Sequence, residues 1–284
     1  MEFLRPRTWA DALAAKAAHP QAVPLAGGTD VMVELNFDRS RPDVLLDLTG
    51  VDDLAHWDAD GEHIRIGAGV PYARIISELG HRLPGLAMAS RTVGSPQIRN
   101  RGTVGGNLGS ASPAGDAHPP LLASGAMIEA ESTRGTRQIH IREFFTGPKR
   151  HALQPDELIK AIVVRAATGP EQFAKIGTRS AMVIAVCSFG LALRPADRRV
   201  GTGIGSAAPT PRRAIEAEAF AAQVLDWDGR TPLEDGVAQR FGELVAAAAE
   251  PIDDVRGTAR YRIHTLGVMA RRTLAWAWTA YREA

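Results

Sequence analysis

The first 168 residues of the chain alternate between strand-like and helix-like patterns of apolar positions. Short apolar or alternating runs predict strands at 22–25, 43–48, 63–70, 127–131, 136–141 and 157–164. Helical spacing predicts helices at 9–18, 71–76 and 83–89, the first of them capped by Thr8. The two strands at 127–131 and 136–141 are expected to pair as a hairpin, because the turn-forming residues 132–135 separate them.

The pattern changes after the turn at 168–170, where we place a domain boundary. Three antiparallel strands are predicted at 173–176, 184–193 and 201–206, and three helices at 212–224, 237–250 and 261–281. Strands followed by helices predict an α+β domain with helices on one face of an antiparallel sheet. The predicted domains are 1–168, with subdomains of about 1–52 and 53–168, and 169–284. In the last helix, Trp276 and Trp278 are expected on opposite sides, so at least one could serve a subunit contact, although such residues more often simply pack.

Composition narrows the classes of protein. The 284 residues are 45% hydrophobic and 23% charged, as in ordinary globular proteins. Lys plus Arg number 33 against 32 Asp plus Glu, a balance that gives no support for nucleic-acid binding. The single cysteine, Cys187, excludes a disulfide within the chain and a cysteine-ligated zinc or iron–sulfur site built from this chain alone. It lies in an apolar run, so we expect a buried thiol. No stretch is long enough to span a membrane and no signal-peptide core is present, so we expect the cytoplasm.

The stretch from Arg101 to Asp116 is rich in glycine and short polar residues. We expect it to form a loop, since such a segment suits neither an ordinary helix nor an ordinary strand. Successive backbone N–H groups in glycine turns form concave sites for anions. The stretch therefore predicts a phosphate-binding loop, with the Asp116 carboxylate available to a sugar hydroxyl.

A second glycine loop, Ala26-Gly27-Gly28-Thr29-Asp30, follows the predicted strand 22–25 and precedes a helical pattern that starts at Val31. Strand, glycine turn and helix is the arrangement in which amides meet a phosphate. The loop lacks the G-x-G-x-x-G spacing, so a Rossmann dinucleotide site is not supported. Alone, the loop favours a tight turn. Two such loops in one chain favour a cofactor site.

The two loops together, with the segments 112–116, 205–214 and 253–262, resemble the FAD-binding medium subunit of the molybdenum hydroxylases. This family includes carbon monoxide dehydrogenase and xanthine dehydrogenase, and the resemblance covers essentially the whole chain. It implies an α+β fold in which a two-part FAD-binding domain of the vanillyl-alcohol-oxidase type precedes a C-terminal antiparallel sheet packed with helices.

The resemblance also implies a set of cofactor-binding residues. The FAD pyrophosphate would be held by Ala26, Gly27, Gly28, Thr29, Asp30 and Val31. The pyrophosphate and ribityl region would meet Thr103, Val104, Gly105, Gly106 and Asn107. Asp116 would accept a hydrogen bond from a sugar hydroxyl, Ile159 would pass beside the cofactor, and Lys175 would approach the flavin. Some relatives stack an aromatic ring on the isoalloxazine, but the aligned positions here are Val93 and 182–183, so we expect aliphatic packing. No catalytic side chain and no metal ligand is expected in this chain.

By resemblance, FAD is the cofactor of this chain, while 2Fe-2S clusters and molybdopterin belong to partner subunits. The implied assembly is a dimer of heterotrimers with an iron–sulfur small subunit and a molybdopterin large subunit. Electrons would pass from the partner's clusters through FAD to a quinone, NAD or another acceptor. One alternative is a stand-alone FAD-dependent oxidoreductase, which needs a general base beside the flavin that the sequence does not reveal. Another is a scaffold without cofactor, which the two intact loops disfavour. The sequence leaves the substrate of the complex open.

Overall fold

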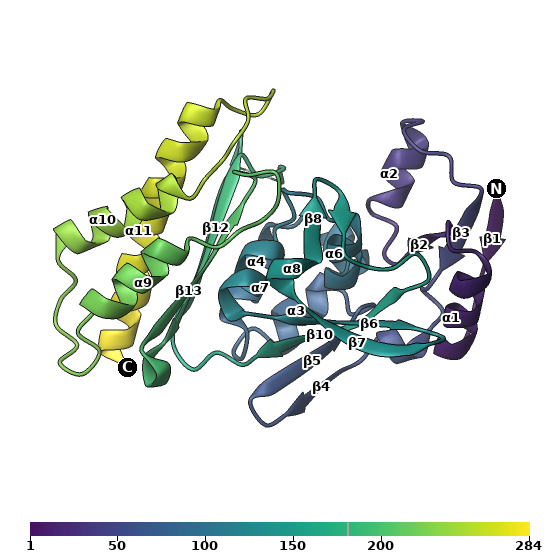
Figure 1. The fold of residues 1–284 in the computed structure, drawn as a ribbon, viewed down its shortest axis with the longest axis horizontal. Coiled ribbons are helices and arrows are strands. Elements are labelled where there is room, and N and C mark those ends of the chain that lie inside the picture. The colour runs from purple at the N-terminus through teal and green to yellow at the C-terminus, as the bar shows by residue number, and fades with distance from the viewer. Residues whose placement is uncertain (181) are drawn as a thin grey trace. The chain divides into compact units, whose positions relative to one another are not determined.

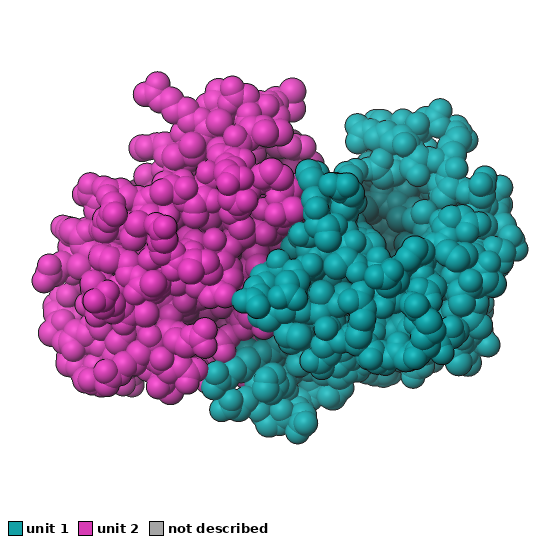
Figure 2. All heavy atoms as spheres, in the orientation of Figure 1, with its two compact units in different colours: residues 1–75, 94–111, 126–165 teal, residues 76–93, 112–125, 166–284 magenta. Residues whose placement is uncertain are grey.

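The computed structural model describes residues 1–180 and 182–284. The chain forms two units, each assembled from three segments of sequence (Figure 2). Unit 1 contains residues 1–75, 94–111 and 126–165, and unit 2 contains residues 76–93, 112–125 and 166–284. Segments 76–93 and 112–125 thus precede residue 168 and yet pack in unit 2. The predicted division of the chain into domains 1–168 and 169–284 stays a prediction.

Unit 1 is built on two sheets (Figure 1). A parallel sheet has the strand order β1-β3-β2, and a larger antiparallel sheet has the order β4-β5-β10-β6-β7. The strands are β1 (Glu2–Leu4), β2 (Val23–Leu25), β3 (Val44–Asp47), β4 (Trp57–Asp60), β5 (His63–Gly67), β6 (Met127–Ser132), β7 (Gly135–His140) and β10 (Leu158–Arg165), with a small hairpin of β8 (Phe145–Gly147) and β9 (Arg150–His151). The predicted hairpin is confirmed as β6 and β7. Strand β4 was not predicted, because its polar, exposed sequence lacks apolar alternation.

The helices of unit 1 are short. They are α1 (Trp9–Ala18), α2 (Val31–Asn36), α5 (Pro96–Arg101), α6 (Val104–Ser110) and α8 (Ile141–Phe144), a 3-10 turn at Asp52–Leu54, and the first part of α3 (Tyr72–Glu78). Helix α1 has the predicted bounds, and the hydroxyl of Thr8 accepts a hydrogen bond from the Asp11 amide at 3.1 Å. Helix α2 begins where it was expected, yet none of its residues is buried.

Unit 2 is a three-layered arrangement around the antiparallel sheet β11-β12-β13 (Figure 1). Its elements are β11 (Glu171–Ile176), β12 (Cys187–Arg194), β13 (Arg199–Gly205), α4 (Pro84–Thr92), α7 (His118–Ser124), α9 (Ile215–Val224), α10 (Asp235–Ala247), α11 (Ala259–Glu283) and a 3-10 turn at Pro195–Asp197. The three strands and three C-terminal helices confirm the predicted order. The helices that follow the sheet, α9, α10 and α11, lie on one of its faces as predicted, and α4 and α7, which precede residue 168, pack on the other face, which was not predicted. Strand β12 is buried almost throughout and needs cover on both faces.

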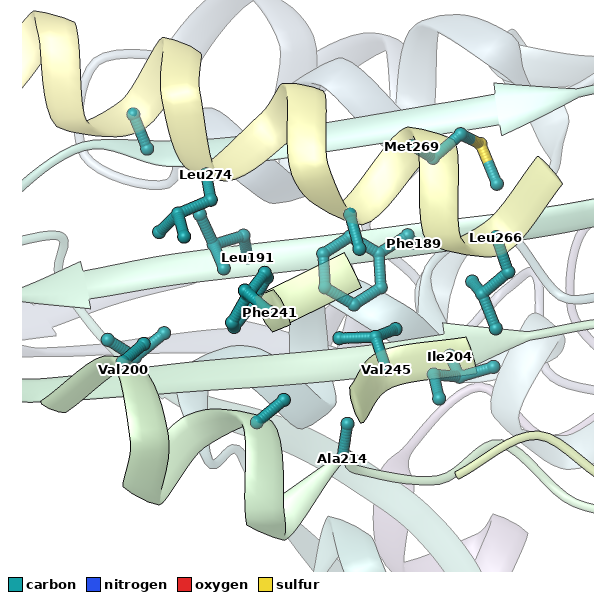
Figure 3. Close-up of a cluster of buried hydrophobic side chains, with 14 of the residues drawn as sticks. Phe189, Leu191, Val200, Ile204, Ala214, Phe241, Val245, Leu266, Met269 and Leu274 are labelled. Carbon is teal, nitrogen blue, oxygen red and sulfur yellow. The ribbon is translucent and has the colours of Figure 1, made fainter. Parts of the chain in front are cut away.

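Helix α7 lies very close to the sheet because glycines replace side chains beneath it. A Cβ on Gly190 would lie 2.8 Å from the carbonyl carbon of Pro119, and a Cβ on Gly203 would lie 2.6 Å from the same atom. The opposite face carries the main hydrophobic core of unit 2, where α9, α10 and α11 contribute side chains such as Phe241 and Leu266 against Phe189 of the sheet (Figure 3).

Cys187 begins β12 and is fully buried, as predicted. Its Sγ lies 3.1 Å from the hydroxyl oxygen of Thr265 on α11. Burial raises the pKa of the thiol, and the Thr265 hydrogen bond and the charge of Arg262 oppose that shift. In the described part of the chain, no helix combines the length and the apolar character that a membrane crossing requires.

Candidate cofactor site

The first glycine loop connects β2 to α2 in unit 1. Gly28 has a φ of +75°, a conformation that glycine adopts without strain. Gly27 lies so close to another backbone segment that a Cβ would overlap the carbonyl oxygen of Arg101 and lie 2.9 Å from the Cα of Gly102. No acceptor among the described residues meets the backbone N–H groups of Gly27, Gly28 and Thr29. The loop therefore presents three amide donors from a tightly packed backbone.

The second predicted loop is largely helical, which corrects the expectation for residues 101–116. Helix α6 runs through Val104–Ser110, and Thr103 is its N-cap, with its hydroxyl accepting from the Gly106 amide at 2.9 Å. Gly105 packs against unit 1's own backbone, since a Cβ there would lie 2.5 Å from the carbonyl oxygen of Ala68. The cap and this packing offset the low helix propensity of glycine. The amides of Val104 and Gly105, in the first turn, have no acceptor in the described parts of the chain.

The two segments lie side by side within unit 1. Besides the contact of Gly27 with residues 101–102, a Cβ on Gly102 would lie 3.4 Å from the Thr29 hydroxyl. A Cβ on Gly106 would lie 3.8 Å from the Ala26 methyl group. The structure thus brings the residues of both predicted glycine segments together, although 75 positions separate Gly27 from Gly102 in sequence.

This arrangement suits a multiply charged anion. Five backbone N–H groups that have no acceptor among residues 1–180 and 182–284 come from two neighbouring segments, two of them at the positive end of a short helix. Such amide clusters bind phosphate oxygens without a buried counter-charge. Figure 2 shows a hollow in the surface of unit 1, beneath the segment that carries α2. In α2 itself, Met32 and Val33 remain 46% and 43% exposed, which leaves apolar surface next to the first loop.

Ile159 lies on β10, where the strand pairing is irregular. The register with β6 shifts between Ile159 and Ala161, and the Lys160 carbonyl oxygen accepts a hydrogen bond from the Ala68 amide at 3.0 Å. Ala68 is the residue against which Gly105 packs. The bulge in β10 therefore holds Ala68, which in turn contacts Gly105 of α6. The Ile159 side chain itself is 8% exposed. Ala68 was missed from the sequence, because an alanine after a strand carries no signal of its own.

The other predicted site residues belong to unit 2. The Lys175 ammonium of β11 lies 2.5 Å from Asp116 Oδ2 and also donates to the carbonyl oxygen of Thr92 at 3.2 Å. The Thr92 hydroxyl lies 3.1 Å from the same Asp116 oxygen. Thr92 is the last residue of α4. It was not among the site residues predicted from the sequence, although it directly precedes Val93, which was.

Asp116 is a buried carboxylate with one satisfied oxygen. Burial raises the pKa of Asp116, and the charge and hydrogen bond of Lys175 oppose that shift. Oδ1 is buried and has no hydrogen-bond partner in the described part of the molecule. A buried acceptor without a partner costs free energy, so this oxygen is suited to a donor from outside the chain, such as a hydroxyl.

The remaining positions are apolar or lie in helices. Val93 is the C-cap of α4 and is half-buried, while Met182 is 45% exposed. His118 is the first residue of α7 and is fully buried. Its ring packs against the backbone of Gly115, where a Cβ would lie 2.7 Å from Nδ1. No cluster of His, Cys, Asp or Glu that could hold a metal ion occurs among the residues described.

Two family models cover most of the chain. Residues 1–165 match the model described as the FAD binding domain in molybdopterin dehydrogenase, and residues 172–277 match the CO dehydrogenase flavoprotein C-terminal domain.

Individual relatives support the same family. The chain is 30% identical over 285 residues to a putative xanthine dehydrogenase FAD-binding subunit of Escherichia coli strain K12, covering 97% of this chain and 95% of the relative. It is 33% identical over 210 residues to the nicotinate dehydrogenase FAD-subunit of Eubacterium barkeri, covering 71% of each. Its fold matches a chain in the structure of carbon monoxide dehydrogenase from Hydrogenophaga pseudoflava, with a TM-score of 0.91 and 27% identity over 99% of this chain and 98% of that one.

Proposed function

The chain belongs to the family of FAD-binding domains in molybdopterin dehydrogenases, and from this membership we propose that its two glycine segments hold the diphosphate of FAD. The observation that supports the proposal is the pairing of Gly27–Thr29 with Val104–Gly105, two neighbouring backbone segments with five amides that no described residue accepts from. The diphosphate of FAD carries two negative charges and needs several donors.

The chain is an FAD-binding subunit of the xanthine and carbon monoxide dehydrogenase type, and thus part of an oxidoreductase. When bound, FAD supplies the redox chemistry, in which electrons are accepted and passed on. The protein's own residues bind and orient the cofactor. No proton-transferring side chain is assigned to this chain.

We assign the other predicted residues to parts of the cofactor. Ala26, Asp30 and Val31 complete the first loop, and Thr103, Gly106 and Asn107 complete the second. Asp116 would accept a hydrogen bond from a sugar hydroxyl through Oδ1, the oxygen for which the described residues offer no donor. The Lys175 ammonium would favour negative charge on the flavin. Ile159 and Val93 would supply aliphatic contacts.

We also propose the assembly that the family suggests. One relative is named the medium chain of carbon monoxide dehydrogenase, and another a subunit of the 6-hydroxypseudooxynicotine dehydrogenase complex. By analogy, this chain would join an iron–sulfur small subunit and a molybdopterin large subunit in a dimer of heterotrimers. Electrons would arrive from 2Fe-2S clusters of the partner and leave to an external acceptor. For its location we propose the cytoplasm, as expected from the sequence.

A titration of the purified full chain with FAD tests the proposal. We expect the flavin fluorescence to change on binding and to saturate at one FAD per chain. Failure to bind FAD at any concentration would overturn the assignment. The same preparation tests the stand-alone alternative: we expect no turnover of purines, aldehydes or N-heterocycles until the partner subunits are added.

A further inference from the structure

Helix α4 is held at both ends by side chains of a single strand, β11. At its N-terminal end, the Gly85 amide donates a hydrogen bond to Oε2 of Glu171 at 3.0 Å. Gly85 allows this contact because a Cβ there would lie 3.0 Å from the same oxygen and 3.2 Å from the Glu171 Cβ. At the C-terminal end, the Thr92 carbonyl oxygen accepts from Lys175 at 3.2 Å.

The spacing of the two side chains matches the helix. Glu171 and Lys175 are four residues apart and point to the same face of the strand, about 13 Å apart at the usual rise per residue. Gly85 and Thr92 are seven residues apart, about 10 Å along a helix. The Glu171 carboxyl accepts a hydrogen bond from a first-turn amide, which has no acceptor within the helix, and the Lys175 ammonium lies at the negative end of the helix dipole. Strand β11 therefore fixes the position of α4 along its axis.

The charge state of Glu171 decides how well this arrangement holds. The side chain is 9% exposed, and burial raises its pKa to about 7, although the Gly85 amide and the charge of Arg194 act in the opposite direction. The titratable or charged groups on the other elements packed against β11 are Cys187 and Arg194 on β12, Arg91 on α4, His118 on α7, and the arginines, Tyr261, His264, Tyr281 and Glu283 of α11. Of these, the Arg194 charge is the one that acts on Glu171.

A buried carboxyl with a raised pKa favours the packed state when it carries its proton. After ionisation, hydration lowers the free energy of the carboxylate. Water reaches the carboxylate when the N-terminal turn of α4 moves away. The C-terminal end of the same helix carries Thr92, which contacts both Asp116 and Lys175. Movement of α4 would therefore reach that pair.

We propose that Glu171 is a positioning residue of the cofactor site: its protonated form holds α4 on β11, and its ionisation loosens α4 and with it the Thr92–Asp116–Lys175 network. The inference rests on the proposed function in one respect, the assignment of Asp116, Lys175 and Val93 to FAD. The site would thus bind FAD more tightly at pH 6 than at pH 8.5.

Amide hydrogen exchange of the full chain without FAD tests the first half. If opening exposes Glu171 fully, the opening equilibrium of α4 rises about tenfold between pH 6 and pH 8.5, after correction for intrinsic exchange. Glu171→Gln keeps an acceptor for the Gly85 amide and should show less than about a twofold change. The matched control is Glu216→Gln, an exposed carboxyl on α9, which should behave as the wild type. An equal pH dependence in Glu171→Gln and the wild type would overturn the proposal.

A second variant guards against misfolding of the first. Gly85→Ala brings a methyl group to 3.0 Å from the Glu171 carboxyl oxygen and also raises the helix propensity of α4, so the readout is the pH dependence of exchange, which should be smaller than in the wild type. An unchanged pH dependence in this variant would also overturn the proposal.

The dissociation constant of FAD tests the second half. The dissociation constant rises by the factor 1 + K, where K is the opening equilibrium constant of α4 measured by hydrogen exchange, so its ratio between pH 8.5 and pH 6 should be larger in the wild type and in Glu216→Gln than in Glu171→Gln. Equal ratios, or an opening constant far below one at pH 8.5, would overturn the positioning role. If no form bound FAD at either pH, the proposed function would fail, while the exchange data would still decide the link between Glu171 and α4.

Discussion

Gly27→Ala is the substitution that most directly tests the pairing of the two glycine segments. The new methyl group would overlap the Arg101 carbonyl and lie 2.5 Å from its carbon and 2.9 Å from the Gly102 Cα. Carbon atoms in contact normally stay about 3.5–4.0 Å apart. The two backbones would therefore have to separate by about 1 Å, and neither is a flexible side chain that could turn aside.

The magnitude follows from the cost of overpacking. Forcing a methyl group into a packed region costs about 1–3 kcal/mol of unfolding free energy. The separation also moves the Gly27–Thr29 amides away from those of α6. If FAD has to restore the original spacing, each 1.4 kcal/mol lowers its affinity about tenfold. We expect the dissociation constant of FAD to rise about tenfold to a hundredfold.

Gly109→Ala is the matched control. Gly109 is in α6, is exposed, and a Cβ there meets no atom within 4 Å. Alanine in a helix interior is more favourable than glycine by about 0.5–1 kcal/mol, so this variant should be slightly more stable and bind FAD as the wild type does. Flavin fluorescence titration and urea unfolding supply both measurements. Wild-type FAD affinity in Gly27→Ala would refute the reasoning.

Three further predictions concern stability. Arg262→Met removes a buried guanidinium that donates to the Val186 and Ser206 carbonyls, so urea unfolding should show a loss of about 2–4 kcal/mol from the two buried acceptors left without a donor. Because the Glu171 pKa rises from 4.5 to about 7, the stability that this group contributes is complete below pH 4.5 and is lost as pH rises through 7. The unfolding free energy of Glu171→Gln relative to the wild type should therefore increase by about 2.5 kcal/mol between pH 5 and pH 8, and a constant difference would contradict this. In α11, Trp278→Ala should cost about 3–5 kcal/mol and Trp276→Ala less than about 0.5, since the two side chains are 1% and 52% exposed; equal thermal shifts would contradict the burial.

Local patterns predicted those elements whose stability is largely local. Helix α1 has its cap in Thr8, the hairpin β6–β7 has its turn, and the strands and helices after residue 170 have clear periodicity. The sequence also placed Trp276 and Trp278 on opposite sides of α11, as the structure confirms.

Non-local packing explains what the sequence did not reveal. Helix α6 is seven residues long and contains three glycines, so its own propensity predicts a loop. It forms because Gly105 packs on Ala68 and Thr103 caps its first turn. Likewise, nothing in the local sequence of α4 and α7 indicates that they cover a sheet whose strands lie some 50 to 120 residues later.

The candidate site shows the same division. Each glycine segment could be found from the sequence, but its residues alone fitted either a turn or a phosphate site. Only the resemblance to a family assigned both segments to one cofactor. The structure adds the physical reason, which is backbone contact between Gly27 and Gly102. Glu171 escaped notice because its importance depends on Gly85, a residue 86 positions earlier that carries no charge.

The burial of Cys187 has a consequence for chemical durability. Peroxide attacks thiolates, and reduced flavins can generate peroxide when they meet oxygen. The one thiol of this chain is fully buried and is hydrogen-bonded to the Thr265 hydroxyl. Burial also raises its pKa, so in the folded state the thiol is both inaccessible and protonated. A thiol reagent or an oxidant would therefore modify Cys187 only after β12 and α11 separate. The rate of modification then measures how often that part of the core opens.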